Sequence, residues 1–579
     1  MKEKVLPGLA LVAAVIVAYL PALQAGFVWN DDTYLTENQI LDRPDALPLI
    51  WTEPKASEQY YPLVFTTFWL EKHLWGLHPL GYHLVNVLLH AGSALLLWAF
   101  LRRLGLPAAW IAAGLFALHP LCVESVAWVT ERKNTLSLFL SLVSMHALFA
   151  SLDARAAAAV PTKKRNARIE VPWHRRPAAL YAGALLAFTL ALFAKTTASV
   201  VPAVLLVLLW WRKGRASYAD AQPLVPFFAV GATLAFHTAW LEKTMVRATG
   251  EEWSLGFPGR LVLAGRVVFF YARKFLVPRD IVFIYPRWTI DASSLAQWLP
   301  AIGAVAILGG AWALRKRIGR GPVTVLLLFG GVLFPAMGFF DVYAMRYSYV
   351  ADHFAYQAVA VAAAGVVCGF ATLVKDVKPA VRKGLGAAAV AVIAVVGAVA
   401  SRQARAFENA ETLWLDTLAK NPDCFMCHTN YGFWLSGQGR VNEAVGHFEE
   451  SLRIRPENVP TLLNLAKIEE DRGRFDAAAG RLRAARAIAA ADTTVLINLA
   501  TVETKAGRVD EAIASYEEAL RIGSPDDYLA HNGLGVAMAR KGRIREAAEQ
   551  FRAALRANPG YAPARSNLEK LLAASGTRN

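Results

Sequence analysis

The sequence has little cysteine and little charge for its length. Four cysteines in 579 residues exclude a scaffold built on disulfides. Asp, Glu, Lys and Arg make up 18% of the chain, whereas soluble globular proteins carry about a quarter. A Walker loop, a dinucleotide-binding glycine motif, a zinc-ligand cluster and a Ser-His-Asp elbow are also missing, which argues against a cytoplasmic enzyme that uses a nucleotide. Apolar residues are what the chain has in quantity: 55% of it is hydrophobic.

These apolar residues are gathered into runs between residue 1 and about 401. Runs of about 17–21 residues cross the hydrocarbon core as helices, because lipid offers no hydrogen-bond partner to open backbone. We interpret the first run as a retained span, since Leu23 and Gln24 make a poor signal-cleavage site before Ala25. The sequence predicts about eleven spans, at 5–25, 83–101, 107–122, 134–152, 178–194, 197–211, 223–241, 295–314, 322–340, 354–374 and 384–401.

Basic residues between the runs predict their orientation. If Lys2 and Lys4 are cytoplasmic, alternation puts five further basic loops on the same side, as the positive-inside rule requires. These loops hold Arg102-Arg103, residues 153–177, Arg212-Lys213-Arg215, Arg315-Lys316-Arg317-Arg320 and Lys375-Lys378-Arg382-Lys383. The segments 26–82, 123–133, 242–294 and 341–353 and the C-terminal region then face outward. The net charge of +16 comes from these clusters, so we expect no nucleic-acid partner.

From about residue 404 the chain becomes charged, alanine-rich and helical in period, with an internal repeat. Gly-Arg pairs at 439, 473, 507 and 542 recur at spacings of 34, 34 and 35 residues. This is the tetratricopeptide pattern, in which small residues let two helices cross closely. We expect four full repeats between a half-unit at 404–421 and a capping helix at 561–574. The predicted domains are therefore a membrane domain, 1–403, and a repeat domain, 404–579.

Asp31 and Asp32 directly follow the first apolar run, in the stretch GFVWNDDTYLTEN. One interpretation is a turn or a helix cap. The other is a general base, with one carboxylate taking a proton from an acceptor hydroxyl. Adjacent carboxylates in a partly dry site also repel each other, which raises one pKa or creates a site for a divalent cation. The residues alone leave these alternatives open.

Other outward stretches carry candidate binding residues. Arg132, with Lys133, would hold a phosphate, because a guanidinium binds phosphate through two hydrogen bonds. Lys195 is a single cation between two apolar runs, which is a functional signal in a membrane protein. The alternative for all of these is an interfacial belt of charged and aromatic side chains. Arg346 would join the phosphate site, and the candidates for the acceptor or sugar site are His119, Glu124, Asp352 and His353.

The stretch CFMCH, residues 424–428, has the spacing of a c-type haem attachment site. It lies on the first helix of the first full repeat, where the sequence offers no haem pocket. We therefore expect a local disulfide or two thiols rather than haem, and no cofactor is certain.

Three features together resemble the transmembrane-and-tetratricopeptide (TMTC-like) O-mannosyltransferases and their bacterial relatives, among the GT-C membrane glycosyltransferases. They are FVWNDDTYL, the pair YHLVNVLLHAGSALLLWAFLRRLG and LFALHPLCVESVAWVTERKNTLS, and the terminal repeats. AKTTASVVPAVLLVLL and MRYSYVADHFAYQAVA also resemble bacterial members. The resemblance implies an all-α fold, with a membrane bundle of about eleven spans followed by a tetratricopeptide solenoid. It also implies a bacterial inner membrane, and the basic loops place the N-terminus in the cytoplasm and the repeats outside.

The resemblance further implies a sugar donor linked to polyprenyl phosphate and an acceptor hydroxyl, often of Ser or Thr in a protein. Asp31 or Asp32 would deprotonate the acceptor, which inverts the anomeric centre. Arg132, Lys133, Lys195 and Arg346 would neutralise the leaving phosphate. The repeats would offer a concave surface to a polypeptide acceptor.

Two alternatives belong to other classes. The first is a repeat scaffold anchored in the membrane without activity, although one span would suffice as an anchor. The second is a transporter of a lipid-linked sugar, which predicts polar residues near the middle of the membrane. The charges here fall mostly at the outward ends of the runs, which favours chemistry at the membrane surface.

Overall fold

The computed structural model describes residues 2–54, 59–159, 176–215, 217–244 and 255–574. Over these residues the chain is helical and contains no strand. It divides into two compact units, Met1–Asn421 and Pro422–Asn579. The basic residues of the predicted loop 153–177 that lie outside the described residues are Lys163, Lys164, Arg165, Arg168 and Arg175.

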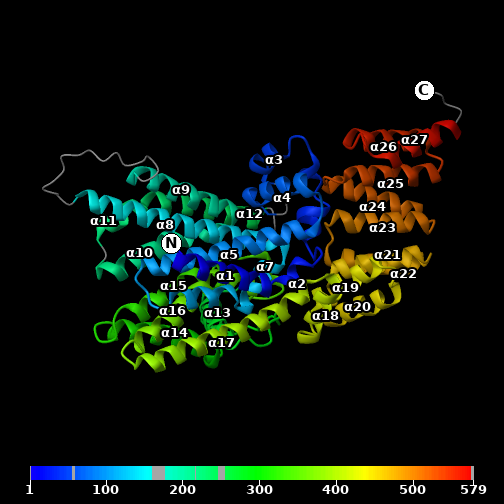
Figure 1. The fold of residues 1–579 in the computed structure, drawn as a ribbon. Helices are drawn as coiled ribbons and strands as arrows, with labels where there is room; N and C mark the ends of the chain where they lie inside the picture. The colour runs from blue at the N-terminus through cyan, green and yellow to red at the C-terminus, as the bar shows by residue number, and fades with distance from the viewer. Residues whose placement is uncertain (1, 55–58, 160–175, 216, 245–254, 575–579) are drawn as a thin grey trace. The chain divides into compact units, whose positions relative to one another are not determined.

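The first unit contains the membrane helices (Figure 1). Within the described ranges, eight helices are long and apolar enough to cross a membrane. They are built on α5 (Pro79–Arg103), α8 (Arg132–Ala159), α9 (Pro177–Ala194), α10 (Val201–Lys213), α12 (Val225–Thr244), α14 (Leu295–Leu314), α16 (Tyr356–Leu373) and α17 (Pro379–Ala404).

Three further apolar segments account for the rest of the predicted runs. Two are shorter helices, α1 (Lys2–Ala18) and α15 (Gly321–Leu333). The third is a pair, α6 (Ala109–Ala117) and Pro120–Ala127, bent by 56°. Each predicted run therefore corresponds to a helix, and eight or, with the bent pair, nine qualify as spans.

The bend interrupts the predicted run 107–122 and has a local cause. Pro120 has no backbone N–H and pushes the preceding residue out of the helical region. His119 is accordingly extended (φ −75°, ψ 131°), and its side chain accepts a hydrogen bond from the Leu121 N–H. The chain re-enters a helix as α7 (Val123–Ala127), passes through a 3-10 turn, η5 (Val129–Glu131), and only then begins α8.

The segment 26–82, which is predicted to face outward, folds against the start of α8. After α2 (Leu20–Leu23) it forms a π-helical turn, η1 (Asp32–Thr36), and then α3 (Ala46–Thr52) and α4 (Pro62–Trp75). Buried Tyr34, Phe65 and Phe68 form an apolar core with Val129. The loop that carries the acidic pair is therefore a packed structure. The segment 242–294, which is predicted to face outward, contains a 20-residue helix, α13 (Phe257–Leu276), that is not among the helices apolar enough to cross a membrane.

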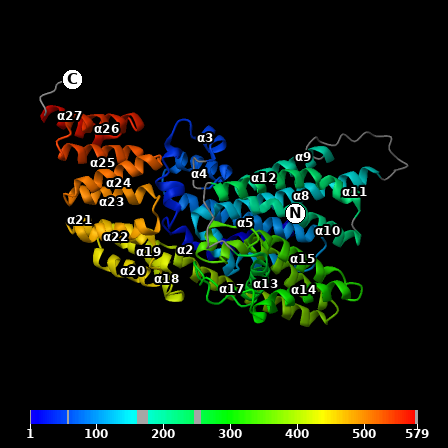
Figure 2. The same ribbon diagram turned by 180° about the vertical axis from the view of Figure 1, so that it is seen from behind.

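The second unit is an array of helix pairs with a final helix, as the repeat pattern predicts. Figures 1 and 2 show the pairs stacked in chain order. The glycines of the four Gly-Arg pairs all have positive φ, from +73° to +82°, which is the reason for glycine between the helices of a pair. The helices are α19 (Phe425–Gly437), α20 (Val441–Ile454), α21 (Val459–Asp471), α22 (Phe475–Ile488), α23 (Thr493–Lys505), α24 (Val509–Ile522), α25 (Asp527–Arg540), α26 (Ile544–Ala557) and α27 (Ala562–Ala574).

The helix α18 (Ala410–Lys420), which the sequence pattern assigns to an incomplete repeat, packs within the first unit. Lys420 Nζ donates to the Ile281 carbonyl at 2.8 Å, and Asn421 Nδ2 donates to the Ile284 carbonyl at 3.0 Å. The Gly26 N–H donates to the Glu408 carbonyl at 2.9 Å. The segment after α17 thus holds the loop that leads to the acidic pair.

Candidate functional site

Asp31 is a buried carboxylate that joins two parts of the first unit. Its Oδ2 accepts from the Val28 N–H at 2.9 Å. Its Oδ1 accepts from the Thr130 N–H at 2.8 Å and from Thr130 Oγ1 at 2.5 Å. Burial raises the pKa of Asp31 to about 6, although the three hydrogen bonds favour the charged form and oppose this shift. Asp31 therefore ties the loop after the first span to the turn before α8.

Asp32 has the opposite environment. It begins η1, its side chain is exposed, and Oδ1 accepts from Thr36 Oγ1 at 3.1 Å. The two adjacent carboxylates are thus distinct: Asp31 is enclosed by donors from its own chain, whereas Asp32 is open to a second molecule.

Lys133 and Lys195 converge on one carboxylate, that of Glu131. Lys133 Nζ lies 2.8 Å from Glu131 Oε1, and Lys195 Nζ lies 3.6 Å from Oε2. Both lysines are less than one-tenth exposed. The ammonium of Lys133 also faces the rings of Tyr34, Tyr61 and Trp128, with centroids at 5.5, 5.6 and 5.7 Å. Lys133, Lys195 and Glu131 together carry a net charge of +1.

Asn134 connects the lysine cluster to the loop before α16. Its Oδ1 accepts from Lys195 Nζ at 2.7 Å. Its Nδ2 lies within hydrogen-bonding distance of Glu131 Oε2, Ser125 Oγ and the carbonyl oxygen of His353. The structure therefore brings together parts of the predicted phosphate and sugar sites.

Glu124 and His353 form a second pair in this cluster. Glu124 Oε1 lies 2.8 Å from His353 Nδ1, and Oε2 accepts from the His353 N–H at 3.1 Å. The neighbouring Asp352 accepts a hydrogen bond on Oδ1 from the Tyr285 hydroxyl at 2.7 Å. Three of the four residues predicted for the acceptor or sugar site thus lie in one region of the fold.

Arg132 is placed differently from Lys133. Its side chain is fully buried, and a guanidinium has five N–H donors. Every one of them meets a protein acceptor: Asn86 Oδ1, Glu71 Oε1 and Oε2, Thr67 Oγ1 and the Tyr82 carbonyl. This arrangement joins α4 and α5 to the start of α8, and it leaves no donor for a phosphate.

His119 and Arg346 make contacts of their own. His119 Nε2 donates to the Phe275 carbonyl at 3.0 Å, and Nδ1 accepts from the Leu121 N–H at 3.2 Å, so both ring nitrogens are used. Its ring stacks on that of Phe275. Arg346 ends a 3-10 turn (Tyr343–Arg346), and its guanidinium lies 6.0 Å from the centroid of the Tyr347 ring.

Sequence reasoning does not single out Glu131, Thr130 or Asn134 as site residues. A carboxylate next to Arg132 and Lys133 is most simply paired with one of them, and Thr and Asn are common at the start of a helix. The available signal is the polar run TERKN inside an apolar region. Within the described residues, no three His, Cys, Asp or Glu side chains are grouped to hold a metal ion.

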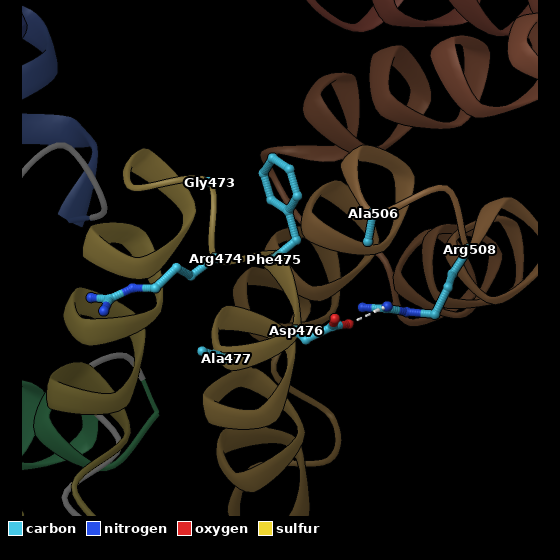
Figure 3. A pocket seen from close by; sticks show the side chains of 7 residues that line it. All are labelled: Gly473, Arg474, Phe475, Asp476, Ala477, Ala506 and Arg508. Carbon is cyan, nitrogen blue, oxygen red and sulfur yellow. Dashed lines mark hydrogen bonds and ion pairs between the residues drawn. The ribbon is translucent and has the colours of Figure 1, made fainter.

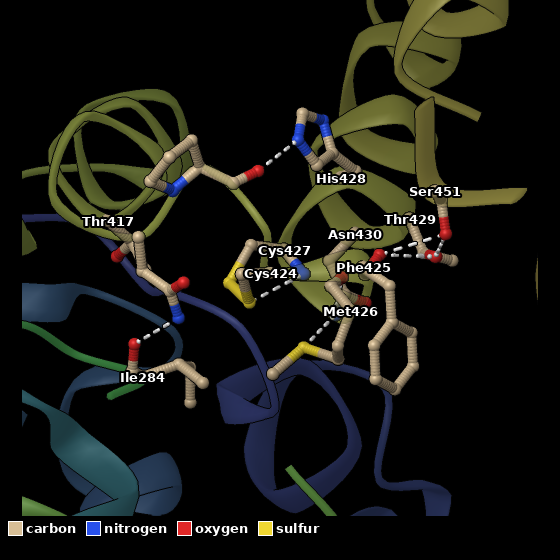
Figure 4. Close-up of a disulfide and its surroundings, with 12 residues drawn as sticks. Ile284, Thr417, Cys424, Phe425, Met426, Cys427, His428, Thr429, Asn430 and Ser451 are labelled. Atoms are coloured by element: carbon tan, nitrogen blue, oxygen red, sulfur yellow. Dashed lines mark hydrogen bonds between the residues drawn. A yellow bond between two sulfur atoms is a disulfide. The ribbon is translucent and has the colours of Figure 1, made fainter. Parts of the chain in front are cut away.

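The repeat unit contains two local features of its own. Cys424 and Cys427 form a disulfide, one of the two states expected for CFMCH, at the start of α19 (Figure 4). Next to it, His428 Nε2 donates to the Pro422 carbonyl at 3.0 Å. Farther along, a hollow of about 260 Å³ lies between α22 and the turn before α24. There Arg508 Nη1 donates to Asp476 Oδ1 at 2.6 Å, and Arg474 points away from this pair (Figure 3).

The fold and the cluster define a polytopic membrane protein with a tetratricopeptide domain and a buried site of carboxylates and lysines. Residues 435–502 and 497–562 match tetratricopeptide repeat families. The Pseudomonas aeruginosa PilF structure covers 26% of this chain, and the match covers 69% of PilF, at 20% identity and a TM-score of 0.25.

Several curated proteins that match part of this chain are named for one activity. The chain is 30% identical over 151 residues to Protein O-mannosyl-transferase F38B6.6 of Caenorhabditis elegans, covering 24% of this chain and 22% of that protein. It is 34% identical over 170 residues to Protein O-mannosyl-transferase Tmtc3 of Drosophila melanogaster, covering 24% and 18%. The chain thus spans about a fifth of the length of the curated relatives it matches, and it resembles the TMTC-like O-mannosyltransferases.

Proposed function

We propose that this protein is an integral-membrane glycosyltransferase of GT-C type. It would move a sugar from a polyprenyl-phosphate-linked donor to an acceptor hydroxyl, such as that of Ser or Thr in a protein. The observation that carries the proposal is the turn 130–133. It binds Asp31 through Thr130 and places Glu131 against the ammonium groups of Lys133 and Lys195. The turn thus joins Asp31, the neighbour of Asp32, to a cationic site, and transfer from a phosphate donor requires both a base and a cationic site.

In this mechanism Asp32 takes the proton of the acceptor hydroxyl, because it is the exposed member of the pair. Asp31 holds the loop through its bonds to Val28 and Thr130. The acceptor oxygen attacks the anomeric carbon on the face opposite the phosphate, and the configuration inverts. The anomeric C–O bond breaks with its electron pair on the phosphate oxygen, and the excess positive charge of the lysine cluster stabilises that anion.

The roles of the remaining candidate residues depend on whether the protein already uses their hydrogen-bonding groups. Arg132 and His119 are assigned to holding the fold, because all their nitrogen positions are used by the protein. Arg346, on the predicted outward loop 341–353, stays a candidate phosphate ligand, and Asp352 stays a candidate for the sugar site. The prenyl chain would lie among the spans, and the tetratricopeptide repeats would present the polypeptide acceptor.

The proposal is tested by reconstituting the full chain in lipid nanodiscs with polyprenyl-phosphate mannose and a Ser/Thr-rich peptide. Mannose is the first sugar to try because the relatives' names contain it. Loss of a general base typically costs about 10²–10⁴ in rate, so we expect that loss for Asp32→Asn. Glu37→Gln removes another exposed carboxylate five residues along the same loop and should keep full activity.

Two outcomes would contradict this assignment. Equal transfer by Asp32→Asn and wild type would show that Asp32 is not the base. A folded wild type that transfers no sugar from any polyprenyl-phosphate donor, while its repeats still bind partner proteins, would favour the membrane-anchored scaffold.

A further inference from the structure

Both carboxylate oxygens of Glu124 bind the same residue, His353. One carboxylate oxygen meets the ring at Nδ1 (2.8 Å) and the other accepts from the backbone N–H of the same residue (3.1 Å). Glu124 belongs to α7, just beyond the Pro120 bend, whereas His353 belongs to the turn before α16. Two bonds from one carboxylate therefore fix both the position and the rotation of the imidazole.

The two contacts of Glu124 with His353 determine which ring nitrogen of His353 is available to a ligand. A carboxylate accepts only, so Nδ1 carries a hydrogen directed at Glu124. Among the described residues, no group forms a hydrogen bond with Nε2 of His353. The side chain keeps 13% of its surface exposed, while Glu124 keeps 3%. A second molecule can therefore reach the imidazole but not the carboxylate behind it.

The imidazole also lies next to the proposed phosphate site. The Trp128 ring is 6.2 Å from the ring of His353 and 5.7 Å from Lys133 Nζ. The carbonyl of His353 accepts from Asn134 Nδ2 at 3.2 Å, and Asn134 also binds Lys195. The lysines share Glu131, so their net charge is only one. A departing phosphate monoester gains a second negative charge, which calls for another donor.

We propose that His353 acts as an imidazolium, in which Nδ1–H is held by Glu124 and Nε2–H donates a hydrogen bond to the departing phosphate oxygen. Glu124 is the positioning residue for this donor. The inference rests on the proposed function, and it moves His353 from the sugar to the leaving group. No additional proton is consumed. The acceptor's proton goes to Asp32, the electron pair of the broken C–O bond goes to the phosphate, and His353 keeps both ring hydrogens, one in a charge-assisted bond to the phosphate.

Two amide replacements separate this role from a structural one. In His353→Gln the side-chain amide reaches about as far as Nε2, whereas in His353→Asn it reaches only as far as Nδ1. Removing one donor to a developing oxyanion typically costs about 10²–10³ in kcat. We expect that loss for His353→Asn, with a smaller change in the donor KM, and recovery to within tenfold of wild type for His353→Gln. His73→Gln, an exposed histidine on α4, is the control and should be unchanged.

A binding measurement keeps the inference testable even if no transfer is found. Native mass spectrometry of the full chain would compare polyprenyl monophosphate with polyprenol of the same length. We expect wild type, Asp32→Asn and His353→Gln to prefer the phosphate, and His353→Asn and Glu124→Ala to lose at least tenfold of that preference. The proposal is overturned if His353→Asn keeps the preference, or if both amide variants lose activity equally. Phosphate preference without sugar transfer would count against the transferase alone.

Discussion

At the scale of the residue, the acidic pair shows how one fold gives neighbouring carboxylates different chemistry. Asp31 is buried with three donors from its own chain, and Asp32 is exposed in a π-helical turn. Asp31 needs the dry environment to hold its loop, and Asp32 needs solvent or substrate access to take a proton. Two adjacent aspartates in a sequence do not show which of them is buried and which is exposed.

The raised pKa of Asp31 makes stability depend on pH. Its pKa is about 6 in the folded protein against an ordinary value of 3.8, so folding favours the protonated form. The associated stability is fully present below about pH 4 and is lost as the pH rises through about 6, a change of ~3 kcal/mol. Asp31→Asn stays neutral, so this pH dependence should disappear from its unfolding curves between pH 4 and 7.

The measurement is thermal unfolding of detergent-solubilised protein at each pH. The exposed Glu37→Gln variant should follow the wild-type pH dependence. If Asp31→Asn shows the same slope with pH as wild type, Asp31 is already ionised throughout that range and the argument from burial fails.

At the scale of the element, the segment 26–82 and the bent pair α6–α7 build the site between them. Pro120 ends one helix and redirects the chain, so that α7 and η5 present Glu124, Thr130 and Glu131 within a few residues of each other. The ion pair between Arg132 and Glu71 then fixes α4 to the start of α8. Arg132, the most basic side chain of the TERKN run, thus has a structural role next to the site.

If Arg132 has this structural role, breaking its ion pair should lower the stability of the protein without changing its affinity for the sugar donor. Glu71→Ala leaves a fully buried guanidinium without its carboxylate, and breaking such a pair costs about 3–5 kcal/mol. We expect the unfolding temperature to fall sharply, while the folded fraction keeps its affinity for polyprenyl phosphate. Arg43→Ala breaks an exposed pair with Asp45 and should cost less than about 1 kcal/mol. Loss of phosphate affinity at unchanged stability would instead return Arg132 to the donor site.

At the scale of the whole molecule, the chain joins a membrane unit to a repeat unit. The proposed chemistry requires that the acidic pair of the membrane unit and the repeats face the outer side. The prediction rests on basic loops alternating with the outward segments 26–82, 242–294 and 341–353. Lys195 and the acidic pair then share one side with the repeats, which is where a polypeptide acceptor would arrive.

Labelling of single introduced cysteines tests this orientation in intact cells. Ser293 lies exposed in the predicted outward segment 242–294, and Lys316 lies exposed in a predicted cytoplasmic loop. The cysteines Cys122 and Cys368 are buried and the other two form a disulfide, so background labelling should be low. We expect a membrane-impermeant maleimide to label Ser293→Cys at once and Lys316→Cys only after permeabilisation. The reverse pattern would place the acidic pair in the cytoplasm.

Features that depend on local pattern could be predicted from the sequence alone. Apolar runs of membrane length predicted every helix that the structure assigns to a span or a shorter apolar segment. The 34-residue period predicted the helix pairs and their final helix, because the pattern of small residues and of glycines with positive φ repeats with the structure. Asp31 and Asp32 were recognisable because charge directly after an apolar run is unusual.

Which charged side chains can act on a ligand depends on the three-dimensional fold. Arg132 and Lys133 are adjacent in sequence, yet one gives all its donors to the protein and the other faces three aromatic rings. Glu124 meets His353 across 229 positions, and α18 packs with the first unit although its pattern is that of the repeats. Pairing of buried charges depends on which partners the fold brings within about 3–4 Å, and sequence spacing does not record that distance.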